Sequence, residues 1–333
     1  MQNFAYEAAN RVDDLFAADG VRTMPIAGGT ELLNWFRLGI AAPDKVIDVG
    51  RIAGLAVIER SVGYLSIGAL ATLNQIGEHP AVRGYARVLA DACLKAASAQ
   101  IRNRATIGGN VLQKTRCTYF RAEAPLPWGC NKRAPGTGCA ARDGLNDRHA
   151  IFGWTDECVA VQPSDPLIAL AALDADVEIA GPAGHRRLPV VDLHLTQQEA
   201  AAAGFDAARV ETRLQPGEVI IGYRLPVLDG ARSAYVKVRE RASYEYALVS
   251  AAAVVTLESG RIARAAIALG SVAQKAWRLP AVEAKLVGQL PARDAVLPIL
   301  DSGLADARPL ACNGYKVAMA SRAAARAIVE AAA

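Results

Sequence analysis

Hydrophobic and polar positions change their spacing along the chain, and each change predicts a different element. Residues 64–70 alternate between apolar and polar side chains, which is typical of a half-buried strand, and residues 44–50 predict another strand. Residues 83–100 and 313–333 instead repeat apolar side chains every three or four positions, as the buried stripe of a helix does. The pattern therefore predicts a chain that mixes strands and helices.

The N-terminal part of this pattern predicts a small α/β unit. A helix is expected over residues 12–20, ending at Gly20, and a strand over residues 22–29. A second helix is expected over residues 30–40. Thr30 is its predicted N-cap, because a hydroxyl at that position accepts a hydrogen bond from a free backbone N–H.

The C-terminal part has a different character. Residues 166–193 predict a short helix followed by a hairpin with the turn Gly-Pro-Ala-Gly. Three later stretches predict consecutive antiparallel strands, with a hairpin turn at Ser259 and Gly260: residues 233–240, 246–260 and 261–272. The change in pattern predicts a domain boundary near residues 225–230.

Composition and charge limit the classes of function. The chain has 333 residues, of which 52% are hydrophobic and 21% charged, enough for two or three globular domains. The formal net charge of +4 is spread without a long basic block, so we expect no nucleic-acid partner. No segment approaches the roughly 20 apolar residues of a membrane span, so we expect no membrane insertion. The N-terminus has no apolar signal core, which predicts a cytoplasmic protein.

Two glycine pairs are candidate phosphate-binding turns. Gly28 and Gly29 lie between the predicted strand and helix near the N-terminus, and Gly108 and Gly109 lie in the sequence TIGGN. Glycine lets a backbone approach a ligand closely, and free N–H groups at a helix start favour an anion. No Gly-x-Gly-x-x-Gly fingerprint follows a strand. Two such turns together would clasp the pyrophosphate of a dinucleotide.

Regular periodicity disappears between residues 113 and 158, and four of the six cysteines lie in this window. A loop of this length without an apolar face needs another source of stability, and four thiolates on a metal centre would supply one. The spacing has no Cys-x2-Cys pair, so it is not that of a zinc finger or ribbon. The predicted ligands are Cys117, Cys130, Cys139 and Cys158.

The residues around these thiols fit an anionic centre but leave its identity open between zinc and an iron–sulfur cluster. Six basic residues surround them: Arg116, Arg121, Lys132, Arg133, Arg142 and Arg148. His149 is an additional candidate ligand. We expect the two remaining cysteines, Cys93 and Cys312, to be small buried residues of helical segments.

The order of several stretches resembles a known family. These stretches are MPIAGGTELL, IRNRATIGGNV, SDPLIALAALDADVEI, GEVIIGYRLP and YVKVRERASYEYALVSAAAVV. Together they are similar to the FAD-binding subunits of the molybdenum hydroxylases, the xanthine dehydrogenase and carbon monoxide dehydrogenase group. The cysteine segment, with RCTYFR and CNKRAPGTGCAARDGLNDRHAIFG, resembles the subunits that carry an extra [4Fe-4S] cluster, as in bacterial periplasmic aldehyde oxidoreductases.

This resemblance implies an α+β fold with two domains. Residues 1–226 would form a two-part FAD-binding domain of the vanillyl-alcohol-oxidase (PCMH) type, with subdomains of about 1–55 and 56–226. The iron–sulfur segment, about 113–158, would be an insertion in the second. Residues 227–333 would form an α+β domain with a three-stranded antiparallel sheet.

The resemblance also implies which residues hold FAD. They are Ile26, Ala27, Gly28, Gly29, Thr30, Glu31, Leu32, Leu33, Asn34, Thr106, Gly109, Asn110, Asp165, Ile220, Lys237 and Tyr246. In relatives without the cluster the Ser-Asp pair closely follows the second glycine turn, whereas here Ser164 and Asp165 follow the cysteine segment. Tyr119 or Arg121 are therefore alternatives to Asp165. As a helix N-cap, Asp165 would also have a purely structural role.

The function implied is that of an electron-transfer subunit without catalytic residues of its own. It would take electrons from the [2Fe-2S] clusters of a small subunit and pass them to an unidentified acceptor. A large molybdopterin-binding subunit would oxidise an aldehyde or heterocycle, in a heterotrimer or a dimer of trimers. Export with a partner that carries a signal would make the protein periplasmic. The alternatives are a self-contained flavin oxidoreductase and a binding or assembly protein whose cysteine segment is held together by zinc.

Overall fold

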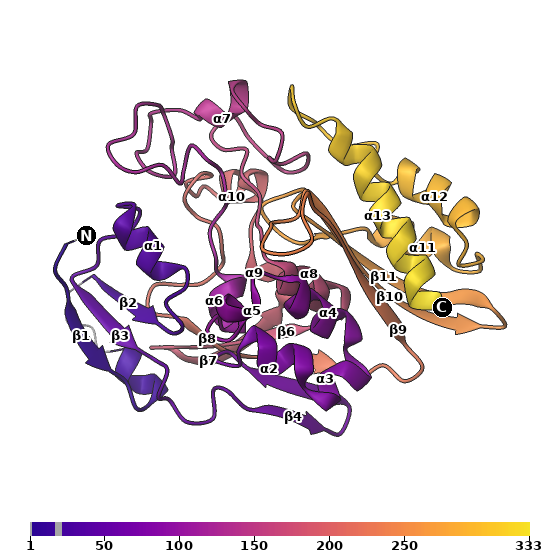
Figure 1. Cartoon of the computed structure of the whole chain (residues 1–333), viewed down its shortest axis with the longest axis horizontal. Helices are drawn as coiled ribbons and strands as arrows, with labels where there is room; N and C mark the ends of the chain where they lie inside the picture. The colour runs from indigo at the N-terminus through magenta and orange to yellow at the C-terminus, as the bar shows by residue number, and fades with distance from the viewer. Residues whose placement is uncertain (1, 17–21) are drawn as a thin grey trace.

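The computed structural model of the protein describes residues 2–16 and 22–333, and the strands in these ranges form three sheets (Figure 1). The first is a parallel sheet in the order β1 (Ala5–Ala8), β3 (Lys45–Asp48) and β2 (Thr23–Ile26). The second is an antiparallel sheet in the order β4 (Ile58–Ser61), β5 (Tyr64–Gly68), β8 (Val219–Pro226), β6 (Asp176–Gly181) and β7 (Gly184–Pro189).

The third sheet is also antiparallel and belongs to the C-terminal part of the chain. Its order is β12 (Trp277–Arg278), β11 (Arg261–Gly270), β10 (Val249–Glu258) and β9 (Arg232–Val238). The sequence predicted three strands here, and the structure adds the two-residue strand β12 at one edge. The turn at Ser259 and Gly260 is confirmed, and both residues adopt positive φ, as a tight hairpin requires.

The described helices cover these sheets and lie mostly between the strands in sequence. They are η1 (Val12–Leu15), α1 (Leu32–Arg37), α2 (Leu73–Glu78), α3 (Pro80–Tyr85), α4 (Arg87–Lys95), α5 (Ala99–Arg102), α6 (Ile107–Val111), α7 (Ala140–Asp143), α8 (Asp165–Ala172), α9 (Val190–Leu193), α10 (Gln197–Ala202), α11 (Pro280–Leu286), α12 (Arg293–Ser302) and α13 (Tyr315–Ala332). None of the described helices has the length and apolar character needed to cross a membrane.

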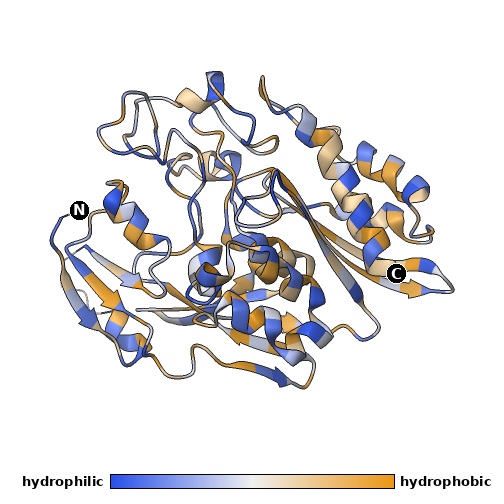
Figure 2. Cartoon of the chain, viewed as in Figure 1, coloured by the Kyte–Doolittle hydropathy of each residue, from blue (hydrophilic) through white to orange (hydrophobic). Residues whose placement is uncertain are grey.

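Strand β10 shows how the two parts of the chain share a core. Ala251 and Ala253 pack with α13 on one face, while Ala252 and Val254 pack with α4 and α8 on the other. Because successive side chains of a strand point to opposite faces, a strand covered on both sides is continuously apolar. In Figure 2 this strand is accordingly mostly hydrophobic, whereas α12 and α13 alternate between hydrophobic and hydrophilic residues.

Two of the predicted N-caps are wrong, and a third predicted helix is described only in part. Helix α1 has Glu31 as its N-cap and no side-chain cap, because the positive φ of Gly29 moves the turn and delays the helix beyond Thr30. Helix α8 is capped by the Ser164 hydroxyl, which accepts from the Leu167 N–H at 3.2 Å, so Asp165 is its first residue and not its cap. Of the helix predicted over residues 12–20, Val12–Leu15 form a 3-10 turn, and residues 17–20 lie outside the described residues.

The cysteine segment, residues 113–158, lies at one end of the molecule, above α1 and α10 in the view of Figure 1. As predicted, regular structure is almost absent from it, and α7 is its one described helix.

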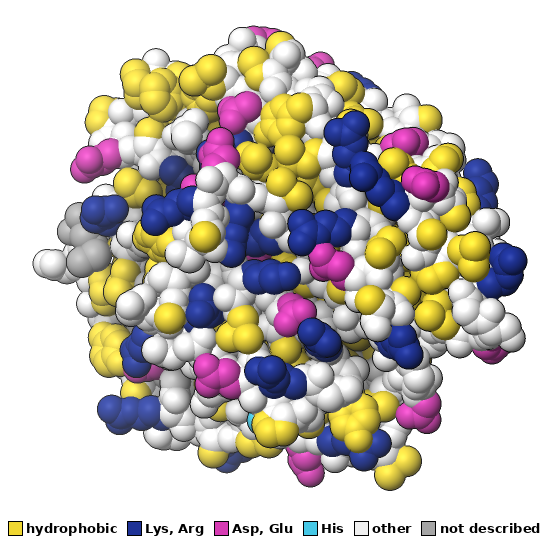
Figure 3. Space-filling model, turned by 45° about the vertical axis from the view of Figure 1, so that its right-hand side comes forward, with side chains coloured by type: hydrophobic (Ala, Val, Ile, Leu, Met, Phe, Trp, Pro, Cys, Tyr) yellow, Lys and Arg dark blue, Asp and Glu magenta, His cyan; other side chains and the backbone are white. Residues whose placement is uncertain are grey.

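On the surface in Figure 3, Lys and Arg side chains gather across the middle of one face with Asp and Glu among them. On this face the basic side chains are thus interspersed with acidic ones.

Candidate functional site

One cavity of about 700 Å³ lies between the parallel sheet, α6 and the loop before β10. This volume is in the range of cofactor sites in proteins. Fourteen of the sixteen residues predicted for the flavin line it: Ile26, Ala27, Gly28, Gly29, Thr30, Glu31, Leu32, Asn34, Thr106, Gly109, Asn110, Asp165, Ile220 and Tyr246. Leu33 is half exposed and does not line the cavity. Lys237 does not line it either, but pairs with Asp165, which does. The structure therefore brings together residues that are far apart in the sequence.

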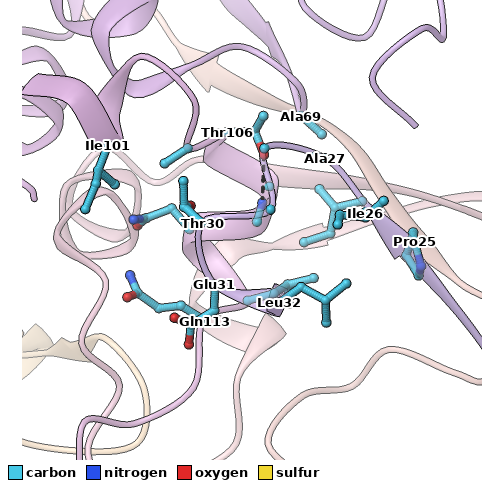
Figure 4. A pocket seen from close by; sticks show the side chains of 18 of the residues that line it. Pro25, Ile26, Ala27, Thr30, Glu31, Leu32, Ala69, Ile101, Thr106 and Gln113 are labelled. Carbon is cyan, nitrogen blue, oxygen red and sulfur yellow. Dashed lines mark hydrogen bonds between the residues drawn. The ribbon is translucent and has the colours of Figure 1, made fainter. Parts of the chain in front are cut away.

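The first glycine turn supplies backbone donors to this cavity. The N–H groups of Gly28, Gly29 and Thr30 have no hydrogen-bond partner among the residues that the structure describes. A Cβ on Gly28 would lie 1.8 Å from the Arg104 carbonyl oxygen, so only glycine allows the two loops to come this close. Figure 4 shows Thr30 beside Thr106 on the far side of the cavity from Pro25 and Ile26.

The second glycine pair differs from the prediction of an equivalent turn. Gly108 and Gly109 lie in the first turn of α6, and their N–H groups are occupied. Gly108 donates to the Ala69 carbonyl at 2.9 Å, and Gly109 donates to the Thr106 hydroxyl at 3.3 Å. This pair therefore fixes the cavity wall, and the side chains of Thr106 and Asn110 are what it offers to a ligand.

Asp165 lies in the cavity wall at the centre of a buried polar cluster. One carboxylate oxygen accepts from the Tyr235 hydroxyl at 2.6 Å, and the other accepts from Lys237 Nζ at 2.7 Å. Both charged side chains are almost fully buried, which is tolerated because each charge is paired. Lys237 reaches the cavity only through Asp165. The alternatives, Tyr119 and Arg121, do not line the cavity.

A second charged group joins the cavity to the cysteine segment. Glu31 accepts from Arg116 at 2.9 Å and from the Trp35 indole at 2.8 Å, and it also pairs with Arg121. Burial alone would raise the pKa of Glu31, but the two guanidinium groups outweigh it and lower that pKa below its ordinary value. The Arg116 guanidinium also lies 4.4 Å from the Tyr246 ring centre. In Figure 4, Glu31 and Gln113, both hydrogen-bonded to Arg116, lie side by side.

Arg116 is a cavity residue that the flavin prediction missed. It was counted only among the cations of the cysteine segment, since it directly precedes Cys117. Its Nε is buried and has no hydrogen-bond partner among the described residues. A basic residue directly before the first cysteine could have suggested Arg116 as a cavity residue, but sequence spacing alone cannot show which way its side chain points.

The four predicted thiols line a second, smaller cavity. Cys117, Cys130, Cys139 and Cys158 all border it, together with His149, and none of the four is in a disulfide. Burial raises the pKa of Cys117 to about 12, and burial also raises the pKa of Cys130 and Cys139. No group of three or more metal-ligating side chains among the described residues is arranged to hold a metal ion. The predicted ligand cage is thus present as a shared cavity and not as a coordination sphere.

Backbone N–H groups surround these sulfur atoms. Cys117 is next to the N–H groups of Phe120 and Tyr119, and Cys130 is next to those of Arg133 and Lys132. Cys139 has similar neighbours in the N–H groups of Val159, Arg142 and Ala141. Donors of this kind lower the energy of thiolates and of anionic clusters bound to them.

The segment between Cys130 and Cys139 is held by its own polar contacts. Asn131 N–H donates to the Gly138 carbonyl at 2.8 Å, and its side-chain oxygen accepts from the Gly138 N–H at 2.8 Å. The Cys130 N–H donates to the Thr137 hydroxyl at 3.0 Å. Gly136 and Gly138 adopt positive φ, so the chain reverses within a few residues. This coreless hairpin therefore brings Cys130 opposite Cys139.

The basic residues of the segment are engaged in specific contacts and are not simply gathered around the thiols. Arg133 donates to the Leu38 carbonyl at 2.9 Å and to the Phe120 carbonyl at 2.8 Å. Arg148 pairs with Glu240 and Glu245 of the loop before β10, and Arg142 pairs with Asp143 and Asp156. Lys132 borders the thiol cavity but pairs with the largely buried Glu211.

The two remaining cysteines behave differently from each other. Cys93 is fully buried in α4, as predicted, and burial raises its pKa. Cys312 is exposed and lies in the turn before α13, so the prediction of a buried helical residue is wrong for it. The chain turns here, and the side chains of Asn313 and Lys316 that follow both donate hydrogen bonds to the His149 carbonyl.

Comparisons with known proteins agree with this arrangement. Residues 2–228 match the family of the FAD binding domain in molybdopterin dehydrogenase, and residues 234–331 match the CO dehydrogenase flavoprotein C-terminal domain. The chain is 40% identical to the aldehyde oxidoreductase FAD-binding subunit PaoB of Escherichia coli over 99% of both chains. It is 26% identical to the carbon monoxide dehydrogenase medium chain of Hydrogenophaga pseudoflava, covering 98% of this chain and 96% of that one.

Solved structures show the same fold. A carbon monoxide dehydrogenase chain from Hydrogenophaga pseudoflava, solved without the Mo-pyranopterin moiety of its molybdenum cofactor, superimposes with a TM-score of 0.75 at 26% identity. The match covers 99% of this chain and 97% of that chain. A quinoline 2-oxidoreductase chain from Pseudomonas putida 86 gives a TM-score of 0.74 over 99% of this chain and 97% of that chain, at 23% identity.

Proposed function

The chain belongs to the FAD-binding medium subunits of the molybdenum hydroxylase family, and we propose that it is the electron-transfer subunit of an aldehyde-oxidising member. Its task would be to take electrons from the [2Fe-2S] clusters of a small subunit and pass them to an external acceptor. A large molybdopterin subunit would oxidise the aldehyde. The observation that carries this proposal is the cavity of about 700 Å³ with unpaired backbone donors at one end.

The cavity residues fit FAD by their chemistry. The free N–H groups of Gly28, Gly29 and Thr30 are suited to a pyrophosphate, and the Thr106 and Asn110 side chains would face it from α6. Apolar residues such as Ile26 and Ile220 offer surface for flat rings. FAD would supply the redox chemistry when bound, while the chain binds, orients and shields it.

Charged side chains at the cavity would tune the electronic properties of the bound flavin. Asp165 reaches the cavity as a carboxylate held by Lys237 and Tyr235, and Arg116 reaches it as a guanidinium held by Glu31. We assign Asp165 and Tyr246 to the flavin environment. Lys237 acts by positioning Asp165.

We further propose that the four thiols hold a [4Fe-4S] cluster. Support comes from their common cavity, the absence of disulfides among them and the backbone N–H groups beside three of them. Cysteine thiolates are the ligands of such clusters. The cluster residues would be Cys117, Cys130, Cys139 and Cys158.

The absorption spectrum of the purified protein tests both assignments. A flavin band with a broad shoulder near roughly 400 nm is expected from a flavoprotein with an iron–sulfur cluster. Acid extraction should release FAD, and iron and sulfide assays should report the cluster separately. A colourless protein containing zinc would contradict the proposal. Aldehyde oxidation by the isolated chain, at the rate of the whole complex, would instead favour a self-contained flavin enzyme.

A further inference from the structure

Arg116 is the one basic side chain among the described residues that line the cavity of about 700 Å³. Its Nη2 donates to Glu31 at 2.9 Å and to Gln113 at 2.7 Å, and its guanidinium lies 4.4 Å from the Tyr246 ring centre. All three of these neighbours line the same cavity. Their contacts therefore fix the guanidinium in the cavity wall.

The other nitrogens of this guanidinium are free. Nη1 and Nε make no hydrogen bond with any residue that the structure describes, and Nε is buried. A buried N–H donor without an acceptor is unfavourable, so these nitrogens suit a ligand that brings acceptors into the cavity. Of the two flat rings of FAD, only the isoalloxazine offers carbonyl oxygens, next to N1 along one edge.

The end of the cavity that holds Arg116 meets the protein surface. Tyr246 is 38% exposed, and Tyr244 in the same loop is 59% exposed. In Figure 4, Glu31 and Gln113, which hold Arg116, lie on the opposite side of the view from Pro25. The isoalloxazine has to exchange electrons with other molecules, whereas adenine takes no part in the chemistry. The reactive ring therefore belongs at this end.

The ion pairs of the cavity wall leave a positive charge at Arg116. Three of the lining carboxylates each pair with a basic residue from outside the cavity: Asp165 with Lys237, Glu218 with Arg186 and Glu245 with Arg148. The fourth, Glu31, is shared by Arg116 and Arg121. Two guanidinium groups on one carboxylate keep one positive charge, which favours the charged form of an anionic ligand group nearby.

We propose that Arg116 supplies the positive charge that holds reduced FAD as an anion, without a proton on N1, and thereby raises the reduction potential of the flavin. The inference rests on the proposed FAD site. Reduction then follows FAD + 2e⁻ + H⁺ → FADH⁻, with the proton on N5 and the negative charge at N1 and the C2 carbonyl. The electrons come from the [2Fe-2S] clusters of the small subunit, and the proton comes from water. A guanidinium beside this edge stabilises the anion more than oxidised FAD.

The side chains that face Arg116 keep their charge near neutral pH. Burial would raise the pKa of Glu31, but the two guanidinium groups outweigh burial and lower it, so Glu31 stays ionised. Burial raises the pKa of Tyr246, so this phenol stays neutral. Arg121, like any arginine, stays charged. The pH dependence of the flavin potential therefore reports the protons that the flavin itself takes up.

Redox titration of the flavin in the full-length protein, saturated with FAD, tests this role. The iron–sulfur absorbance is subtracted with a flavin-free sample. At a fixed potential, the ratio of reduced to oxidised flavin in wild type should change about tenfold per pH unit, because one proton accompanies two electrons. In Arg116→Met, this ratio at the wild-type midpoint should fall about tenfold, which is about 30 mV for a two-electron couple. On the acid side of neutrality, its pH dependence should approach the square of the wild-type factor, because N1 then takes up a second proton.

Two further variants separate the charge of Arg116 from its structural contacts. Arg116→Lys keeps a cation at the cavity and should keep the uptake of one proton. Arg121→Met removes the other partner of Glu31, which does not line the cavity, and should keep the one-proton dependence as well. A purely structural role of Arg116 would make the methionine variants at both positions behave alike.

The proton count of the wild type decides the question even where Arg116→Met does not fold. Uptake of two protons by wild type on the acid side of neutrality would overturn the inference. Arg116→Met with bound FAD and an unchanged potential would overturn it too, and a weaker FAD affinity in that variant would then place another part of FAD beside Arg116. A wild-type protein that neither contains nor binds FAD would instead contradict the proposed function itself.

Discussion

At the scale of single residues, Glu211 shows how the structure keeps a largely buried carboxylate charged. It accepts from Lys114 at 2.7 Å and from Lys132, which comes from the cysteine segment. Burial would raise the pKa of Glu211, but the two ammonium groups outweigh burial and lower it to about 2. Because Lys132 borders the thiol cavity, this carboxylate helps to anchor the segment to the rest of the chain.

The lowered pKa of Glu211 predicts an acid-sensitive part of the stability. A carboxyl whose folded pKa lies below its ordinary value of 4.5 stabilises the fold above that pH, and the effect is lost as pH falls towards about 2. Glu211→Gln should lower the free energy of unfolding at pH 7. The difference in the free energy of unfolding between this variant and wild type should narrow by on the order of 2 kcal/mol as the pH falls from roughly 5 to 3.

Urea unfolding at several pH values measures this difference. Glu330→Gln is the matched control, since Glu330 pairs with Arg326 on the surface of α13. That pair should contribute at most about 1 kcal/mol at any pH. A constant difference between Glu211→Gln and wild type across this pH range would contradict the assignment.

At the scale of elements, the turn between β2 and α1 depends on Gly28. A Cβ there would meet the Arg104 carbonyl oxygen at 1.8 Å, so Gly28→Ala must push the turn away from the segment before α6. Since the free N–H groups of this turn are those assigned to the pyrophosphate, we expect FAD affinity to fall at least about tenfold, which corresponds to 1.4 kcal/mol. Isothermal titration of the flavin-free protein with FAD measures the loss.

Gly84→Ala separates this steric effect from a general effect of alanine. Gly84 lies in α3, and a Cβ at that position meets nothing within 4 Å. Alanine there should leave FAD affinity unchanged and raise stability slightly, by up to about 1 kcal/mol. Equal FAD affinities for the two alanine variants would show that the close approach of the loops is unimportant.

The elements that the sequence predicts well are those with long, regular patterns. The hairpin of β10 and β11 and the helix α13 follow directly from apolar spacing and from Ser259-Gly260. Short elements such as α1 and α6 are set by contacts across the chain, so Thr30 does not cap a helix and Gly108 lies inside one. The directions of Lys237 and Arg116 could not be predicted either, because both depend on carboxylates far away in the sequence.

At the scale of the whole molecule, the cysteine segment is a brace between both walls of the cavity that we assign to FAD. Arg116 and Arg121 bind Glu31 at the start of α1, and Arg133 binds the carbonyls of Leu38 and Gly39 beyond its end. On the other side, Arg148 binds Glu240 and Glu245 in the loop that contributes Tyr246 to the cavity. The cysteine segment therefore contacts both α1 and the loop before β10.

This arrangement predicts that loss of the cluster weakens flavin binding. Cys130→Ser should lower iron and sulfide to background and loosen the segment, because its hairpin has little apolar surface to hold it. The contacts with Glu31 and with the loop around Tyr246 would then be less populated. We expect the dissociation constant of FAD to rise about tenfold, equivalent to 1.4 kcal/mol, while the separate domain cores stay folded.

Iron assay, FAD titration and hydrogen exchange on the same preparation distinguish a brace from an independent insertion. Exchange should increase in residues 113–158, in α1 and in the loop around Tyr246, but not in β5 and β6, whose core contains no residue of the segment. Cys312→Ser, at the exposed cysteine, should leave all three measurements unchanged. If Cys130→Ser lost its iron and kept full FAD affinity, the cluster would stabilise only its own loop. The contacts of Arg116, Arg121, Arg133 and Arg148 would then have no consequence for flavin binding.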